Sequence, residues 1–145
     1  NMKTNHFLEQ LQDKEIVAAI HAAEQKTSGE IRVFISHKKI TDALATATAQ
    51  FQKLGMAKTR QRNAVLIYVA PQSHQFAVVG DVAVHRQCGD AFWQSLAAEM
   101  TGHFKKAEFT QGIIHTVQKA GELLAQHFPP SPADGNKLPD KVEHD

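Results

Sequence analysis

The chain has 145 residues, of which 42% are hydrophobic, so it is long enough for one domain with a real core and short for two. Its 16 basic and 15 acidic residues leave a net charge of +1, which gives no reason to expect nucleic acid or an anionic membrane as a partner. No apolar run approaches the roughly 18 residues needed to cross a bilayer, and the N-terminus lacks the apolar segment of a signal peptide. We therefore expect a cytoplasmic protein without a transmembrane segment.

Cysteine and histidine usage bears on metal chemistry. Cys88 is the single cysteine, which excludes an intrachain disulfide and a cysteine-based metal site. Most of the nine histidines are scattered singly, without the HxH or HxxxH spacing that would place two imidazoles on one helix face. The sequence therefore disfavours a zinc site.

The first half of the chain alternates helical and extended patterns. Apolar residues at helical spacing predict a helix that begins at Asp13 as its N-cap and ends before Gly29; these residues are Ile16, Ala19, Ile20 and Ala23. Residues 30–36 place Ile31, Val33 and Ile35 on one face and Arg32, Phe34 and Ser36 on the other, which is typical of a strand with at least one buried side. Asp42 is placed to cap a second helix, which Gly55 ends.

The middle of the chain predicts a hairpin. Residues 63–70 (NAVLIYVA) are so continuously apolar that they indicate a central strand covered on both faces. Four residues separate them from a second strand at 75–81, so the two strands should pair antiparallel. The pairs Gly80-Asp81 and Gly89-Asp90 suit turns and helix starts, where the Asp oxygen accepts backbone N–H bonds.

Two amphipathic helices and a tail complete the chain. Apolar stripes predict helices over 92–104 and 113–128, and the stripes themselves are core rather than a cofactor site. The segment from Pro129 holds three prolines in four residues and should be extended, either free or docked. Strands that alternate with helices place the chain in the α/β class, with one domain over 2–128 and a Pro-rich, acidic tail over 129–145.

This topology brings acidic residues to one rim of the sheet. A helical crossover should make the strands at 30–36 and 63–70 parallel, and the hairpin then returns the strand at 75–81 to the end where they began. Five carboxylates are expected on that rim: Glu30, Asp81, Asp90, Asp134 and Asp140. Crowded carboxylates repel one another and attract a hard cation, calcium or magnesium. Solvated carboxylates and local caps are the alternative interpretation.

A basic loop precedes the second strand. Arg60 and Arg62 could bind an anion or a phosphate through their guanidinium groups, or they could simply be solvated. If the cation and the anion sites both form, a metal-bridged phosphoryl group would lie between them, and metal-assisted phosphoester hydrolysis becomes possible. The chain lacks GxSxG, the P-loop motif, GxGxxG and HExxH, so the catalytic residues stay unknown.

Several motifs together resemble the TPM domain family, also described as the TPM phosphatase group. They are SGEI (28–31), RNAVLIYVA (62–70), and VGD (79–81) followed by GDAFW (89–93), within a resemblance that spans 13–140. The resemblance implies an α/β, three-layer-like sandwich with a mixed central sheet of about four strands flanked by helices. It also implies calcium or a related divalent ion at acidic loops, with Glu30, Asp81 and Asp90 as site residues.

The same resemblance frames the expected function. Some members of the family show acid phosphatase activity, and others act as assembly or modulatory factors for membrane complexes. We therefore expect a binding or assembly module of the short soluble branch, with calcium or magnesium as cofactor and a protein partner, which could be a membrane complex. A weak metal-assisted acid phosphatase is the alternative. In the tail, DGNKLPD (134–140) has Lys137 where the branch usually carries an acid, so one potential ligand is lost.

Overall fold

The sheet of the computed structural model is mixed and has four strands in the order β3-β2-β1-β4. The structure describes residues 2–130 and 140–145, with side chains from residue 12 onward. The strands are β1 (Glu30–Ile35), β2 (Ala64–Ala70), β3 (Gln75–Gly80) and β4 (Val142–His144). β1 is parallel to both β2 and β4, whereas β2 and β3 are antiparallel. The predicted crossover and the predicted hairpin are both confirmed.

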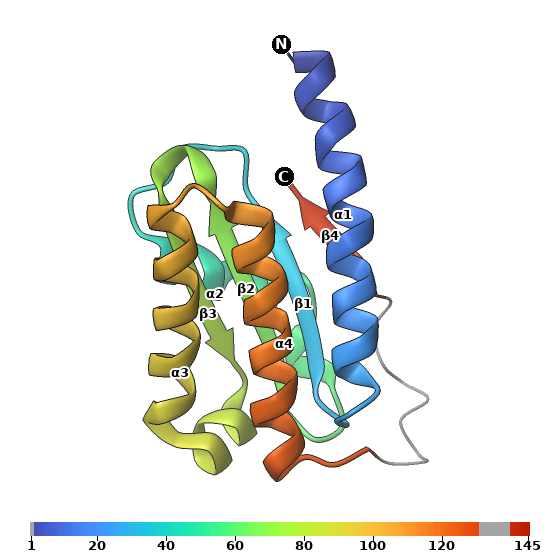
Figure 1. Ribbon diagram of the computed structural model, residues 1–145. Helices are drawn as coiled ribbons and strands as arrows, with labels where there is room; N and C mark the ends of the chain where they lie inside the picture. The colour runs from blue at the N-terminus through green and yellow to red at the C-terminus, as the bar shows by residue number, and fades with distance from the viewer. Residues whose placement is uncertain (1, 131–139) are drawn as a thin grey trace.

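Helices cover both faces of this sheet. Within the described residues, the α-helices are α1 (Met2–Glu24), α2 (Ala43–Lys53), α3 (Val82–Lys105) and α4 (Phe109–His127), and the short 3-10 helices are η1 (Met56–Lys58) and η2 (Pro71–Ser73). α1, α3 and α4 lie on one face and α2 lies on the other (Figure 1). The α/β three-layer sandwich expected from the sequence is confirmed.

Strand patterning explains the two cores. Ile31 and Val33 of β1 pack in the core beneath α1, α3 and α4, while Phe34 belongs to the core beneath α2. There its ring stacks on that of Tyr68, with the centroids 5.4 Å apart. All seven residues of β2 are buried, because this interior strand is covered on both faces.

Of the N-caps predicted at Asp42 and Asp13, the structure has only the one at Asp42. The side chain of Asp42 accepts a hydrogen bond from the Ala45 backbone N at 3.0 Å and caps α2 as predicted. The predicted cap at Asp13 is wrong, because α1 begins at Met2 and runs straight through that position. Asp13 instead lies 2.7 Å from the His144 ring, between its Oδ2 and the ring Nε2, and so joins α1 to β4.

The two Gly-Asp pairs have different roles. Asp81 caps α3 through a hydrogen bond from the Val82 N at 2.8 Å, so α3 begins earlier than the sequence pattern indicated. Gly89 interrupts α3 with φ of 70° and ψ of −171°, a backbone conformation that glycine adopts without a Cβ clash. Asp90 directly follows this kink and is exposed.

The end of the chain forms a strand that the sequence analysis did not predict. β4 pairs with the second half of β1, and the Asp145 carboxylate accepts a hydrogen bond from the His37 N at 2.7 Å. Residues 131–139 of the tail, Asp134 included, lie outside the described residues. Among the described helices, none has the length and the apolar character that a membrane crossing requires.

Candidate functional site

Glu30 and Asp81 lie at the same end of the sheet, as the topology predicted. Glu30 pairs in register with Ala64 at the start of β2, and the Asp81 N donates to the Ala64 carbonyl at 2.9 Å. One strand therefore separates the two acids, a spacing of about 10 Å across neighbouring strands. Both side chains are buried.

Asp81 is engaged by Arg62. Its two carboxylate oxygens accept hydrogen bonds from Arg62 Nε at 2.6 Å and Nη2 at 2.7 Å, in a bidentate ion pair. The hydrogen bond to Asp81, and then the charge of Asp81, raise the pKa of Arg62. The Arg62 carbonyl also accepts from the Ala83 N at 3.1 Å. These contacts tie the loop before β2 to the start of α3, and they occupy the guanidinium that was predicted to bind an anion.

The other predicted site residues do not gather around Asp81. Asp90 and Arg60 are exposed, and Asp140 lies on the far side of β1, beside α1. Among the described residues, no three of the predicted carboxylates bring ligand oxygens within 4.8 Å of one another. Cation binding at these positions stays a prediction, but the structure does not collect them into a single rim site.

Glu24 is an acidic residue that the sequence analysis missed. It is the last residue of α1, it is buried, and its Oε2 accepts from the Ile31 N at 2.7 Å. Burial raises its pKa to about 9, and a side-chain hydrogen bond with Asp140 and the charge of Glu30 act in the same direction. We call Glu24, Glu30 and Asp140 the carboxylate pole, although their carboxylate oxygens do not all lie within 4.8 Å of one another. An acid at a helix end is usually solvated, so nothing local in the sequence distinguishes Glu24.

The carboxylate pole connects three segments of the fold. Glu24 closes α1, Glu30 opens β1, and Asp140 lies two residues before β4. Asp140 Oδ2 is also 3.2 Å from Nδ1 of the exposed His21 ring on α1. Contacts among these acids therefore bear on how the last strand is held against α1 and β1.

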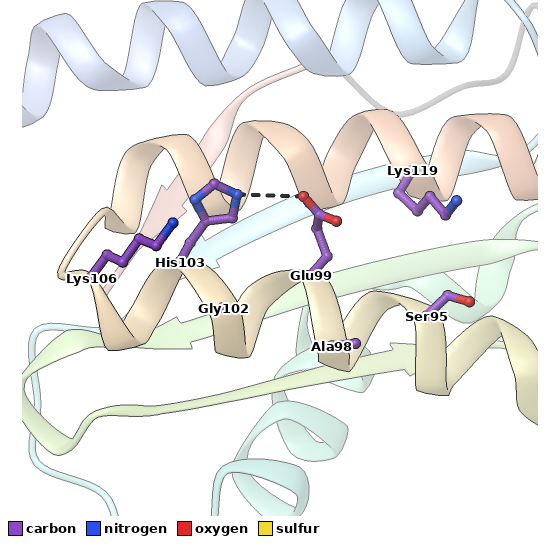
Figure 2. A pocket seen from close by; sticks show the side chains of 7 residues that line it. All are labelled: Ser95, Ala98, Glu99, Gly102, His103, Lys106 and Lys119. Carbon is purple, nitrogen blue, oxygen red and sulfur yellow. Dashed lines mark ion pairs between the residues drawn. The ribbon is translucent and has the colours of Figure 1, made fainter.

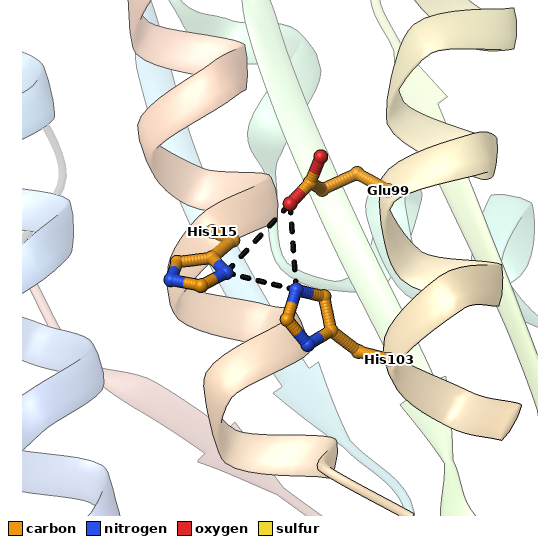
Figure 3. A group of neighbouring side chains, drawn as sticks. All are labelled: Glu99, His103 and His115. Atoms are coloured by element: carbon orange, nitrogen blue, oxygen red, sulfur yellow. Dashed lines mark hydrogen bonds and ion pairs between the residues drawn. The ribbon is translucent and has the colours of Figure 1, made fainter. Parts of the chain in front are cut away.

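A second group of titratable side chains lies between α3 and α4. Glu99 and His103 come from α3 and His115 comes from α4, and one ligand atom from each lies within 4.8 Å of the others (Figure 3). No HxH or HxxxH spacing in the sequence links His103 or His115 to another histidine. Twelve residues separate them along the chain, so only the packing of the two helices brings them together.

Comparison with known proteins identifies the family. A family model described as the TPM domain matches residues 2–123, which is most of the chain. The chain belongs to the TPM domain family. The match runs from the start of α1 into α4 and ends before β4, so Asp140 of the carboxylate pole lies beyond it.

Several solved structures resemble this TPM domain, and two of them show the range of similarity. The NMR structure of BA42 from the psychrophilic bacterium Bizionia argentinensis is 36% identical, with a TM-score of 0.85 and coverage of 92% of each chain. The N-terminal domain of the cg2496 protein from Corynebacterium glutamicum is 15% identical, with a TM-score of 0.62, and covers 81% of this chain and 74% of its own; it shares the fold. The search of curated proteins gave no match.

Proposed function

We propose that this TPM domain is a divalent-cation-binding module, with calcium preferred over magnesium, and that the carboxylate pole holds the ion. The observation that carries the proposal is the burial of the Glu24 carboxyl beside Asp140 and Glu30. The Glu24 pKa of about 9 means that burial, Asp140 and Glu30 together make a second negative charge costly there. A cation that takes the place of the proton would relieve the same repulsion.

The donor chemistry supports a hard ion. The carboxylate pole offers carboxylate oxygens, which suit calcium and magnesium better than a soft or borderline metal. Calcium accepts six to eight oxygens in irregular geometry, whereas magnesium requires near-ideal octahedral geometry. Ligands drawn from a helix end, a strand start and the segment before β4 favour the more permissive ion.

A bound ion would have a structural consequence. Asp140 precedes β4 by two residues, and β4 forms one edge of the sheet. An ion shared by Glu24 and Asp140 would fasten that edge to α1, and an ordered edge strand is a surface on which a protein partner can pair. The protein partner and the cytoplasmic location expected from the sequence belong to this proposal.

The phosphatase alternative has less support. It requires Arg60 or Arg62 to orient a phosphate beside the metal. The Arg62 guanidinium is paired with Asp81, and Arg60 is an exposed loop residue. No observation favours hydrolysis over binding, so we propose the binding module.

Calcium titration of the full chain tests the proposal. Calorimetry should detect saturable binding, and a hundredfold excess over Kd should stabilise the fold by about 2.7 kcal/mol. Glu24→Gln and Asp140→Asn should weaken binding, because each replaces a carboxylate that the ion would bind with a neutral amide. Asp90→Asn, which changes an exposed acid predicted from the sequence as a ligand, should bind normally if the carboxylate pole holds the ion, and Glu122→Gln, an exposed acid of α4, is the matched control. Calcium binding that Asp90→Asn weakens and Glu24→Gln leaves intact would contradict the proposal.

A further inference from the structure

Close helix packing creates a second group of metal-ligand side chains, far in sequence from the carboxylate pole. Glu99 and His103 are four residues apart on α3, so they share one helix face. Gly112 lets α4 approach this face, because a Cβ at that position would lie only 2.7 Å from the His103 Cβ. His115 follows Gly112 by one helical turn and meets His103 across the interface.

The three ligand atoms converge on one point. His115 Nδ1 lies 2.8 Å from His103 Nε2, and Glu99 Oε1 lies 3.4 Å from His103 Nε2 and 3.7 Å from His115 Nδ1 (Figure 3). A tetrahedral zinc ion with bonds of about 2.0–2.1 Å needs donors about 3.3–3.4 Å apart. The observed separations lie on both sides of this value, so small side-chain rotations would close the site around an ion.

Glu108 contacts His103 on the side of the ring that faces away from Glu99 and His115. Its Oε1 lies 3.3 Å from His103 Nδ1, the ring nitrogen that faces away from the cluster. A carboxylate that accepts the Nδ1–H leaves Nε2 as a lone pair directed at Glu99 and His115. Metal-binding histidines commonly carry such a carboxylate partner, which fixes the tautomer and makes the ligand more basic.

We propose that Glu99, His103 and His115 form a zinc site on the α3–α4 surface. Two imidazole nitrogens and one carboxylate oxygen match a borderline metal such as zinc and are a poor set for calcium. The three side chains are partly buried, so they are held in place and still reachable from solvent. This site is separate from the calcium site proposed above and does not depend on it.

A pocket beside the cluster gives the ion room for a further ligand. Glu99 and His103 line a pocket of about 430 Å³ together with Lys106 and Lys119 (Figure 2). Three protein ligands leave one position of a tetrahedral zinc ion open. Water or a small anion attracted by the two lysines can occupy it.

Metal titration of the full, tag-free chain tests the site. Zinc should bind one-to-one by calorimetry, and cobalt(II) should give the intense visible absorption of a tetrahedral complex. His115→Gln and Glu99→Gln should each weaken zinc binding by at least about tenfold, and Glu108→Gln by about ten- to a hundredfold. His127→Gln changes an exposed histidine of the same helix and should leave binding unchanged. Melting curves recorded with a chelator should confirm that each variant is folded.

Three results would overturn the zinc site. The first is zinc binding that survives His115→Gln, and the second is binding that His127→Gln weakens equally, which would indicate general surface histidines. The third is zinc binding lost in Glu24→Gln and kept in Glu99→Gln, which would place the ion at the carboxylate pole. Calcium binding should be unchanged in His115→Gln, so failure of the zinc site and failure of the calcium site give different results.

Discussion

Replacing Glu24 by glutamine should flatten the dependence of folding stability on pH. Glu24 has a pKa of about 9 in the folded chain, against an ordinary value of 4.5. Below pH 4.5 both states carry the proton and the stability is fully present. Between 4.5 and 9 the folded state keeps a proton that the unfolded state has lost, so stability falls as pH rises through this window. Glutamine is neutral throughout and removes this contribution.

The size of the effect follows from the folded and the ordinary pKa of Glu24. Each unit of pH within the window costs about 1.4 kcal/mol for one linked proton. From pH 5 to pH 7 the wild-type chain should therefore lose about 2–3 kcal/mol that the Glu24→Gln variant retains. The substitution preserves a carbonyl oxygen to accept from the Ile31 N, so the comparison isolates the charge.

Urea unfolding at several pH values between 5 and 8.5, in the presence of a chelator, measures this difference. Other titrating groups are common to both proteins and cancel in the comparison. Glu122→Gln, an exposed acid on α4, is the matched control and should follow the wild-type curve. Parallel curves for wild type and Glu24→Gln would refute the reasoning, because Glu24 would then be ionised in the folded chain.

Substitutions at three further positions test contacts that hold the fold together, each by urea unfolding. Gly80→Ala should cost about 1–3 kcal/mol, since its Cβ would lie 2.3 Å from the Trp93 ring; unchanged stability would mean that the ring can move aside. Asp42→Ala should cost about 1 kcal/mol through loss of the α2 cap, whereas Asp42→Asn should cost little. Arg62→Ala should lower the urea midpoint, because it leaves the buried Asp81 carboxylate without its cationic partner. Arg62→Lys should restore only part of the lost stability, because lysine cannot form the bidentate pair. Full restoration of the midpoint by lysine would count against the bidentate geometry.

Local sequence signals predicted much of the fold. Three predictions that each depend on a few neighbouring residues are confirmed. They are the buried strand β2 with its continuous apolar run, the hairpin to β3 through a four-residue connection, and the cap of α2 at Asp42. The position of Asp81 at the end of the sheet that Glu30 begins also followed from chain direction alone.

Features set by tertiary contact were missed or assigned wrongly. Asp13 has the chemistry of an N-cap, yet α1 continues through it, and its side chain meets His144 instead. β4 has only three residues and no clear alternation, and pairing with β1 makes it a strand.

The sites depend even more on tertiary contact. Glu24 resembles any polar residue at a helix end until α1 packs against β1 and buries it. The meeting of His103 and His115 requires a glycine on the opposing helix, a requirement that is visible only once the two helices are packed. The sequence disfavoured zinc because the HxH and HxxxH spacings detect only histidines on the same element, whereas His103 and His115 come from two different helices.

Proton release on calcium binding tests the proposed function most directly. If a cation replaces the proton that Glu24 keeps, calorimetry at pH 7 in buffers of different ionisation enthalpy should show about one proton released per calcium bound. The Glu24→Gln variant should release almost none. Calcium binding without proton release in the wild type, or with equal release in both proteins, would contradict a calcium site at the carboxylate pole.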